Sequence, residues 1–136
     1  MKLKGYISSR DFMGERVPQH VQNAYLRAYC SEKKFTFFLS ASEYTMNNSY
    51  IILKKTINEL NNFDGLIAYS IFQMPYSNSD RTYIFQQLIK CKKKIYFAVE
   101  DISIVDENDI RRVDDLWRIK KTLKYSLNSF KNINGQ

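Results

Sequence analysis

The sequence has few of the residues that interrupt or cross-link a chain: its 136 residues include four glycines, two prolines and two cysteines. So few glycines and prolines argue against flexible linkers and low-complexity segments. Cys30 and Cys91 stand far apart without C-x-x-C spacing, which argues against a disulfide framework or a zinc motif. Because His20 is the only histidine, we expect no metal centre, no Ser-His-Asp triad and no cofactor.

Long hydrophobic runs are also missing. No stretch approaches the roughly 18 consecutive apolar residues of a membrane span, and residues 1–6 lack the apolar run of a signal peptide. We therefore expect a cytoplasmic protein. A chain of 136 residues that is 44% hydrophobic has the size and composition of one domain with a buried core.

Positive charge exceeds negative charge by seven, and the excess gathers late in the sequence. The basic residues cluster at residues 90–94 and again between residues 111 and 131. A basic surface of this kind favours polyanions, phosphorylated metabolites or anionic lipid. Because acidic residues between 106 and 115 interleave with the first arginines of the later segment, a solvated face crossed by salt bridges is the alternative.

Short apolar runs alternate with amphipathic segments along the chain. The runs predict four buried strands, at residues 3–8, 35–39, 65–70 and 94–99. Their nearly continuous apolarity is typical of a sheet covered on both faces. Between the strands, apolar residues recur every three or four positions and predict three helices, the first of them beginning near Pro18.

Strands that alternate with helices require right-handed crossovers and therefore a mostly parallel sheet. We expect a three-layer, flavodoxin-like α/β domain over residues 1–105, with four strands in the order 2-1-3-4. A long amphipathic helix is expected at residues 106–131 as part of the same domain, and a disordered tail at residues 132–136. Because only part of so long a helix can dock on the sheet, we expect its distal half to form a homodimer; the alternative is that it folds back along its own domain.

The first candidate site follows the first strand. In an open parallel sheet, ligands bind outside the carboxyl ends of the strands, where the strand order reverses. Arg10 and Arg16 predict a cradle for an anionic group, because guanidinium groups and unpaired helix amides both bind phosphate or carboxylate oxygens. A solvated loop is the alternative. The polar side chains predicted to bind a ligand beside this cradle are Ser8, Ser9, Gln19, Gln22 and Asn23.

The loop after the second strand combines a carboxylate with a phenol. Glu43 is a candidate general base or acceptor for a sugar hydroxyl, and Tyr44 is a candidate acid or stacking platform. Together with Ser8, these two residues form the predicted catalytic set. The alternative is that Glu43 is an ordinary solvent-exposed carboxylate.

The loop at residues 69–75, after the third strand, is apolar for a loop. This composition predicts a wall or lid over a ligand, or alternatively a hydrophobic subunit contact. The remaining residues predicted to bind a ligand lie in or near these loops, and they are Ser49, Tyr69, Ser70, Phe72, Arg81 and Glu100.

The order of these elements resembles the catalytic domain of serine resolvases. The resemblance implies a resolvase-like fold, and the active site departs from the family's pattern. Such recombinases need a serine nucleophile after a tyrosine-x-arginine-valine run and arginines after the third strand. Here Arg10 stands at the position of the nucleophile, and residues 70–77 contain no arginine.

The sequence also resembles the sporadic carbohydrate cluster proteins, which are small bacterial proteins encoded among polysaccharide biosynthesis genes. This resemblance implies a biological setting and a residue list without a reaction. The matching residues are Gly5, Tyr6, Ile7, Ser8, Ser9, Arg10, Phe12, Gly14, Arg16, Pro18, Gln19, Gln22, Asn23, Leu39, Ser40, Glu43, Tyr44, Met46, Ser49, Asp64, Gly65, Tyr69, Ser70, Phe72, Pro75, Arg81 and Glu100.

Three functions are therefore considered. The first is a small enzyme that acts on a sugar, sugar phosphate or nucleotide-activated sugar in surface-polysaccharide synthesis, with an anionic sugar or nucleotide sugar as its ligand. The second is a non-catalytic module that binds such a ligand or a partner of the same pathway. The third is a resolvase-like nucleic-acid binder without cleavage activity, whose basic closing helix would follow phosphates. We expect the first, and no nucleic-acid partner.

Overall fold

The computed structural model describes residues 1–9, 11–12, 16–43 and 50–133, with side chains described as far as residue 123. The strands of its sheet follow the order β2-β1-β3-β4-β5; the first four are parallel and β5 is antiparallel to β4. The α/β fold and the order 2-1-3-4 are confirmed. The strands are β1 (Lys2–Ser8), β2 (Thr36–Glu43), β3 (Gly65–Ala68), β4 (Lys94–Phe97) and β5 (Ile102–Ile104).

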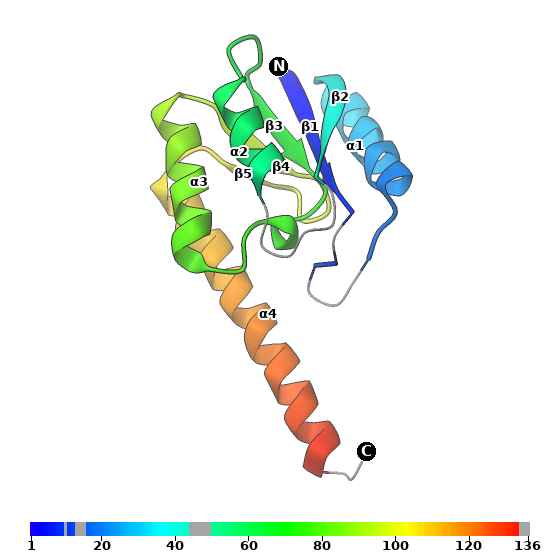
Figure 1. Ribbon diagram of the computed structural model, residues 1–136, viewed down its shortest axis with the longest axis vertical. Coiled ribbons are helices and arrows are strands. Elements are labelled where there is room, and N and C mark those ends of the chain that lie inside the picture. The colour runs from blue at the N-terminus through cyan, green and yellow to red at the C-terminus, as the bar shows by residue number, and fades with distance from the viewer. Residues whose placement is uncertain (10, 13–15, 44–49, 134–136) are drawn as a thin grey trace.

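Helices cover both faces of the sheet and form a three-layer arrangement (Figure 1). From β1 to β2 the chain moves toward one edge of the sheet, and from β2 to β3 it moves back toward the other edge. Because right-handed crossovers reverse face when the direction reverses, α1 lies on one face while α2 and α3 lie on the other. The helices are α1 (Gln19–Lys33), α2 (Ile51–Asn58), the 3-10 helix η1 (Ile71–Gln73), α3 (Asn78–Lys90) and α4 (Glu107–Ile133).

The strand β3 lies at the centre of the core. Leu66 and Ala68 pack into the apolar cluster on the side of α2, α3 and α4, whereas Ile67 packs on the side of α1. All four residues of β3 are buried, as its continuous apolar run predicts. Gly65 has no room for a side chain, because a Cβ there would lie 2.0 Å from the carbonyl oxygen of Lys94 on β4.

The second strand extends further than predicted. Ala41, Ser42 and Glu43 pair with Tyr6, Ile7 and Ser8 of β1, so part of the segment that we expected to be a loop is strand. These residues are small or polar and carry little strand signal of their own. Their conformation is set by the backbone hydrogen bonds to β1.

The structure adds one strand to the predicted sheet and also shows whether its helices could span a membrane. The strand β5 was not predicted, because a run of three residues gives too short a pattern to recognise. Within the described part of the chain, no helix is both long and apolar enough to cross a bilayer.

The first turns of α4 dock on the domain, and the rest of the helix extends beyond the sheet (Figure 1). Ile110, Val113 and Trp117 are buried, whereas Ile119 and Leu123 are 53% and 56% exposed. Because side chains after residue 123 lie outside the description, the homodimer through residues 106–131 stays a prediction.

A buried arginine fastens α4 to the rest of the domain. The Arg81 side chain is fully buried, with its guanidinium carbon 4.4 Å from the centre of the Trp117 ring. Its Nη2 donates to Oδ1 of Asp114 on α4 at 3.0 Å, and its Nη1 donates to the carbonyl oxygens of Pro75 and Tyr76 at 3.0 and 2.9 Å. We call this group of contacts the Arg81 clamp.

We expect Arg81→Ala to lower the free energy of unfolding by about 3–5 kcal/mol, because the change leaves a carboxylate and two carbonyl oxygens without their buried partner. Arg81→Lys should recover only part of the loss, since an ammonium lacks the planar fork that reaches all three groups. Denaturation followed by Trp117 fluorescence measures both variants.

The control is an exposed ion pair within α4, in which the Arg118 guanidinium lies 3.1 Å from the Asp115 carboxylate. Arg118→Ala should change the free energy of unfolding by less than about 1 kcal/mol. Equal losses for Arg81→Ala and Arg118→Ala would contradict the clamp.

Candidate functional site

Two buried glutamine side chains lie between the carboxyl ends of β1 and β3, where the strand order reverses. Gln73 of η1 donates from Nε2 to Oε1 of Gln22 on α1 at 2.7 Å. Gln22 in turn donates from Nε2 to the carbonyl oxygens of Ser8 and Val17, at 2.8 and 2.7 Å. The same Gln22 Oε1 accepts from the backbone amide of Ser8 at 3.3 Å. We call this group the glutamine network.

The glutamine network also includes the loop after β3. Oε1 of Gln73 accepts from the backbone amides of Tyr69 and Ser70, at 3.0 and 3.2 Å. Its Nε2 lies 3.4 Å from the hydroxyl oxygen of Ser8, whose side chain is fully buried. An amide nitrogen donates hydrogen bonds and cannot accept a proton, so this neighbour does not activate the Ser8 hydroxyl as a nucleophile.

Glu43 joins β2 to the start of α2. Its Oε1 accepts from the Tyr6 hydroxyl at 3.0 Å and from the backbone amide of Leu53 at 3.2 Å, and its Oε2 accepts from the amide of Ile52 at 2.9 Å. A carboxylate at this place satisfies amides that the helix itself leaves unpaired, and it is favoured by the helix dipole. The cap of α2 therefore comes from a neighbouring strand, since Tyr50 at the N-cap position makes no side-chain cap.

A second carboxylate holds the loop after β3. Glu100 accepts from the Ser70 hydroxyl at 2.7 Å and from the backbone amide of Ile71 at 2.8 Å. Ser70 also accepts from the amide of Phe72 at 3.2 Å. These contacts shape one side of a hollow of about 230 Å³ at the strand ends, which is lined by Phe12, Val17, Tyr69, Ser70, Phe72, Val99, Glu100 and Lys120.

The polar residues predicted around the first loop point to different places. Gln22 enters the glutamine network, whereas its neighbour Asn23 accepts a hydrogen bond from the Ser40 hydroxyl of β2 at 2.6 Å. Ser9 donates to the carbonyl oxygen of Glu43 at 3.4 Å. Gln19 is half-buried at the start of α1.

The arginines predicted to bind a ligand also lie apart. The exposed Arg16 is 4.0 Å from the carboxylate of Asp11, and Arg81 is buried in the clamp between α3 and α4. Arg10, Tyr44 and Ser49 lie outside the described residues.

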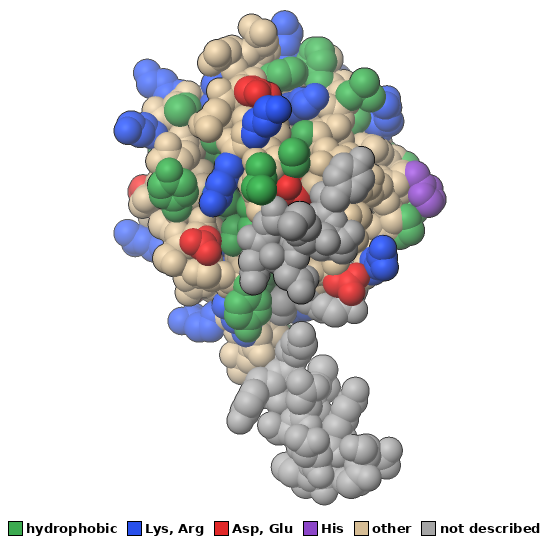
Figure 2. Space-filling model, in the orientation of Figure 1, with side chains coloured by type: hydrophobic (Ala, Val, Ile, Leu, Met, Phe, Trp, Pro, Cys, Tyr) green, Lys and Arg blue, Asp and Glu red, His purple; other side chains and the backbone are tan. Residues whose placement is uncertain are grey.

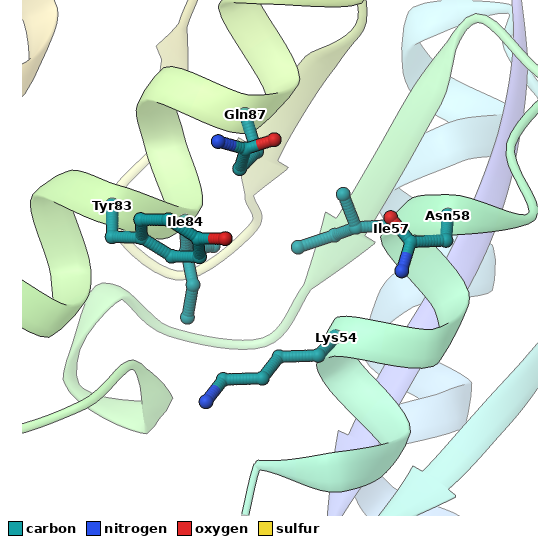
Figure 3. Close-up of a pocket in the computed structure, with 6 residues that line it drawn as sticks. All are labelled: Lys54, Ile57, Asn58, Tyr83, Ile84 and Gln87. Carbon is teal, nitrogen blue, oxygen red and sulfur yellow. The ribbon is translucent and has the colours of Figure 1, made fainter.

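Sequence reasoning missed a groove between α2 and α3. One hollow of about 160 Å³ is lined by Lys54, Ile57, Asn58, Tyr83, Ile84 and Gln87 (Figure 3). A larger hollow of about 430 Å³ shares Lys54, Tyr83 and Ile84 with it and is also lined by Tyr50, Pro75, Tyr76, Ser77 and Asp80. We call the two together the α2–α3 groove. Its lining comes from helices distant in sequence, so no local motif marks it.

Basic side chains lie along α4. Arg111, Arg112 and Arg118 are exposed. The Lys120 ammonium lies 5.4 Å from the Phe72 ring at the strand-end hollow, and burial together with the nearby Arg81 guanidinium lowers the pKa of Lys121. Figure 2 shows that further Lys and Arg side chains are spread over the visible face of the domain.

Solved structures resemble this chain over nearly its whole length. The N-terminal catalytic domain of TP901-1 integrase is 16% identical, with a TM-score of 0.61; the match covers 94% of this chain and 98% of that domain. A resolvase family site-specific recombinase from Streptococcus pneumoniae is 9% identical, with a TM-score of 0.64; the match covers 98% of this chain and 97% of the recombinase. No protein-family model and no curated protein matches the sequence. The likeness establishes a resolvase-like fold.

These comparisons overturn the predicted carbohydrate function. No family model supports the resemblance to sporadic carbohydrate cluster proteins, and the similar solved structures are recombinase and integrase domains. The predicted sugar or nucleotide-sugar ligand and the exclusion of nucleic acid as a partner are therefore wrong. At the strand ends, the buried side chains of Gln22 and Gln73 occupy part of the crevice in which a sugar was expected and bond to each other.

We expect Glu43→Ala to lower the free energy of unfolding by about 2–4 kcal/mol, because it removes the carboxylate that accepts from two helix amides and from the Tyr6 hydroxyl. Glu43→Gln keeps one acceptor oxygen and should lose less. Urea denaturation followed by circular dichroism measures both variants.

The control is Glu59→Ala, which removes an exposed carboxylate at the other end of α2 and should change the free energy of unfolding by less than about 0.5 kcal/mol. Similar losses for Glu43→Ala and Glu59→Ala would contradict the capping role.

Proposed function

We propose that this chain is a resolvase-like module that binds nucleic acid without cleaving it, in the cytoplasm. The observation that carries the proposal is the likeness to an integrase domain and a site-specific recombinase, which covers 94% and 98% of the chain. Recombination is a reaction of nucleic acids. A chain that shares the recombinase fold over nearly its whole length is therefore a candidate to bind nucleic acid as well.

The strand ends argue against cleavage. Phosphoryl transfer by a protein nucleophile requires an activated nucleophile and cationic groups that stabilise the developing negative charge. At the position of the resolvase serine this sequence has Arg10, and residues 70–77 contain no arginine. The groups that fill the described crevice are the neutral amides of Gln22 and Gln73.

The charge of the chain suits a polyanionic partner. The net charge is +7, and exposed arginines lie on α4. Arg111 and Arg118 are separated by two helical turns, which is about 10 Å along the helix axis. That distance corresponds to about three steps of a nucleic-acid strand, so the two guanidinium groups are able to contact different phosphates. The exposed partner of Arg118, Asp115, would then be exchanged for a phosphate.

We expect the protein to bind a fluorescein-labelled 30-base-pair DNA duplex of arbitrary sequence with an affinity that falls as salt rises. Fluorescence anisotropy between 50 and 200 mM salt measures this dependence. The double variant Arg111→Glu/Arg118→Glu should bind at least about tenfold more weakly at low salt, and the slope of log affinity against log salt should fall by about 2.

The control carries the same change of net charge on the opposite side of the sheet. Lys33→Glu/Lys34→Glu alters the end of α1, and it should leave the affinity for the duplex within about threefold of the unchanged protein. Absence of binding to this duplex and to a single-stranded DNA at 50 mM salt would overturn the proposed function. An equal loss of duplex affinity in both double variants would mean that the net charge of the protein attracts DNA without a binding surface on α4. Appearance of nicked DNA would contradict the absence of cleavage.

A further inference from the structure

The two hollows of the α2–α3 groove lie side by side. They share Lys54, Tyr83 and Ile84, and the larger one extends to Tyr76 near α4. Two adjoining hollows suit an extended ligand better than a compact one.

Groups suited to a nucleobase line the narrower part of the groove. Figure 3 shows Ile57 and Asn58 of α2 on one side and Ile84 and Gln87 of α3 on the other. The two isoleucines are buried and form the apolar walls of this part of the groove. The two carboxamides each offer donors and an acceptor, which are the groups that hydrogen-bond to the edge of an unpaired base.

Two exposed tyrosine rings provide surfaces for stacking. Tyr83 is 57% exposed and lies in both hollows, and Tyr76 is 60% exposed at the far end. The Tyr76 ring is held from within the domain, because its centre lies 5.8 Å from that of Trp117 and 3.9 Å from the Lys121 ammonium. A ring held in this way loses little conformational freedom when a base stacks on it.

Positive charge lies where the two hollows meet and beside Tyr76. Lys54 is an exposed lysine on α2 that lines both hollows, and Lys121 donates to the carbonyl oxygen of Tyr76 at 3.0 Å. The exposed carboxylate of Asp80 lines the larger hollow. Two ammonium groups against one carboxylate leave the groove with an excess of positive charge for phosphates.

We propose that the α2–α3 groove binds a short single-stranded segment of nucleic acid, with bases stacked on Tyr83 and Tyr76 and a phosphate on Lys54. This proposal rests on the proposed function and names the form of nucleic acid that it involves. Stacking on protein aromatic rings requires unpaired bases, because the bases of a duplex are stacked on one another. Through Tyr76 and Lys121, the strand continues toward the basic residues of α4.

The test compares single-stranded 12-mers of deoxythymidylate and uridylate with the 30-base-pair duplex, using the full chain and fluorescence anisotropy. Tyr83→Ala should weaken binding of the 12-mers by about 5- to 100-fold, the effect expected for one stacked base. Tyr83→Phe keeps the ring and should bind as the unchanged protein does. Binding of the duplex should remain within about twofold in both variants.

Lys54→Ala and its neighbour Lys55→Ala form a matched pair. Lys54 lines the α2–α3 groove, whereas Lys55 lines a separate hollow beside β2. Lys54→Ala should weaken binding of the 12-mers several-fold, and Lys55→Ala should leave it nearly unchanged. Photocrosslinking of a 12-mer that contains 5-iodouracil should modify Tyr83 or Tyr76.

The outcomes separate this proposal from the proposed function. Duplex binding without 12-mer binding would overturn the groove and leave the proposed function intact. Equal weakening by Lys54→Ala and Lys55→Ala, or a Tyr83→Ala variant that binds the 12-mers normally, would also overturn the groove. Binding of neither nucleic acid would overturn both.

Discussion

The buried guanidinium of Arg81 joins α4, which carries the exposed arginines, to the segment before α3. Arg81 connects the segment before α3 to α4, and the Trp117 ring beneath it donates from Nε1 to the carbonyl oxygen of Ile71 at 3.1 Å. Burial lowers the pKa of Arg81, and the hydrogen bond and the charge of Asp114 oppose this shift. These contacts connect α4 to the segment before α3 and to η1.

The strand ends and the outer surface have opposite character. At the strand ends, where this fold class places its ligands, the amides of Gln22 and Gln73 are satisfied by one another and by the backbone. Glu43 and Glu100 hold a helix and a loop through backbone amides. A polar network satisfied in this way rigidifies the domain. The proposed binding surfaces, the exposed arginines of α4 and the α2–α3 groove, lie outside this network.

The predicted fold held because its signals are local and repeated, whereas the predicted site depended on contacts between distant segments. The first four strands and the helix after Pro18 lie close to where hydrophobic periodicity places them. Gln22 and Glu100 lie near strand ends, but their partners were not visible in the sequence: Gln73 is 51 positions from Gln22. No family model supports the resemblance to a carbohydrate family, and packing against Lys94 is reason enough for one of its matching residues, Gly65.

By itself, the sequence determined the alternation of strands and helices, the order of the four parallel strands, and the amphipathic pattern that buries Val113 and Trp117. Those features follow from apolar spacing, which is a property of short segments. Only the tertiary structure decided that Glu43 caps α2, that Arg81 is buried, and that α2 and α3 enclose a groove. A polar side chain takes its role from whichever donors and acceptors the fold brings beside it, and those neighbours come from segments that local patterns do not connect.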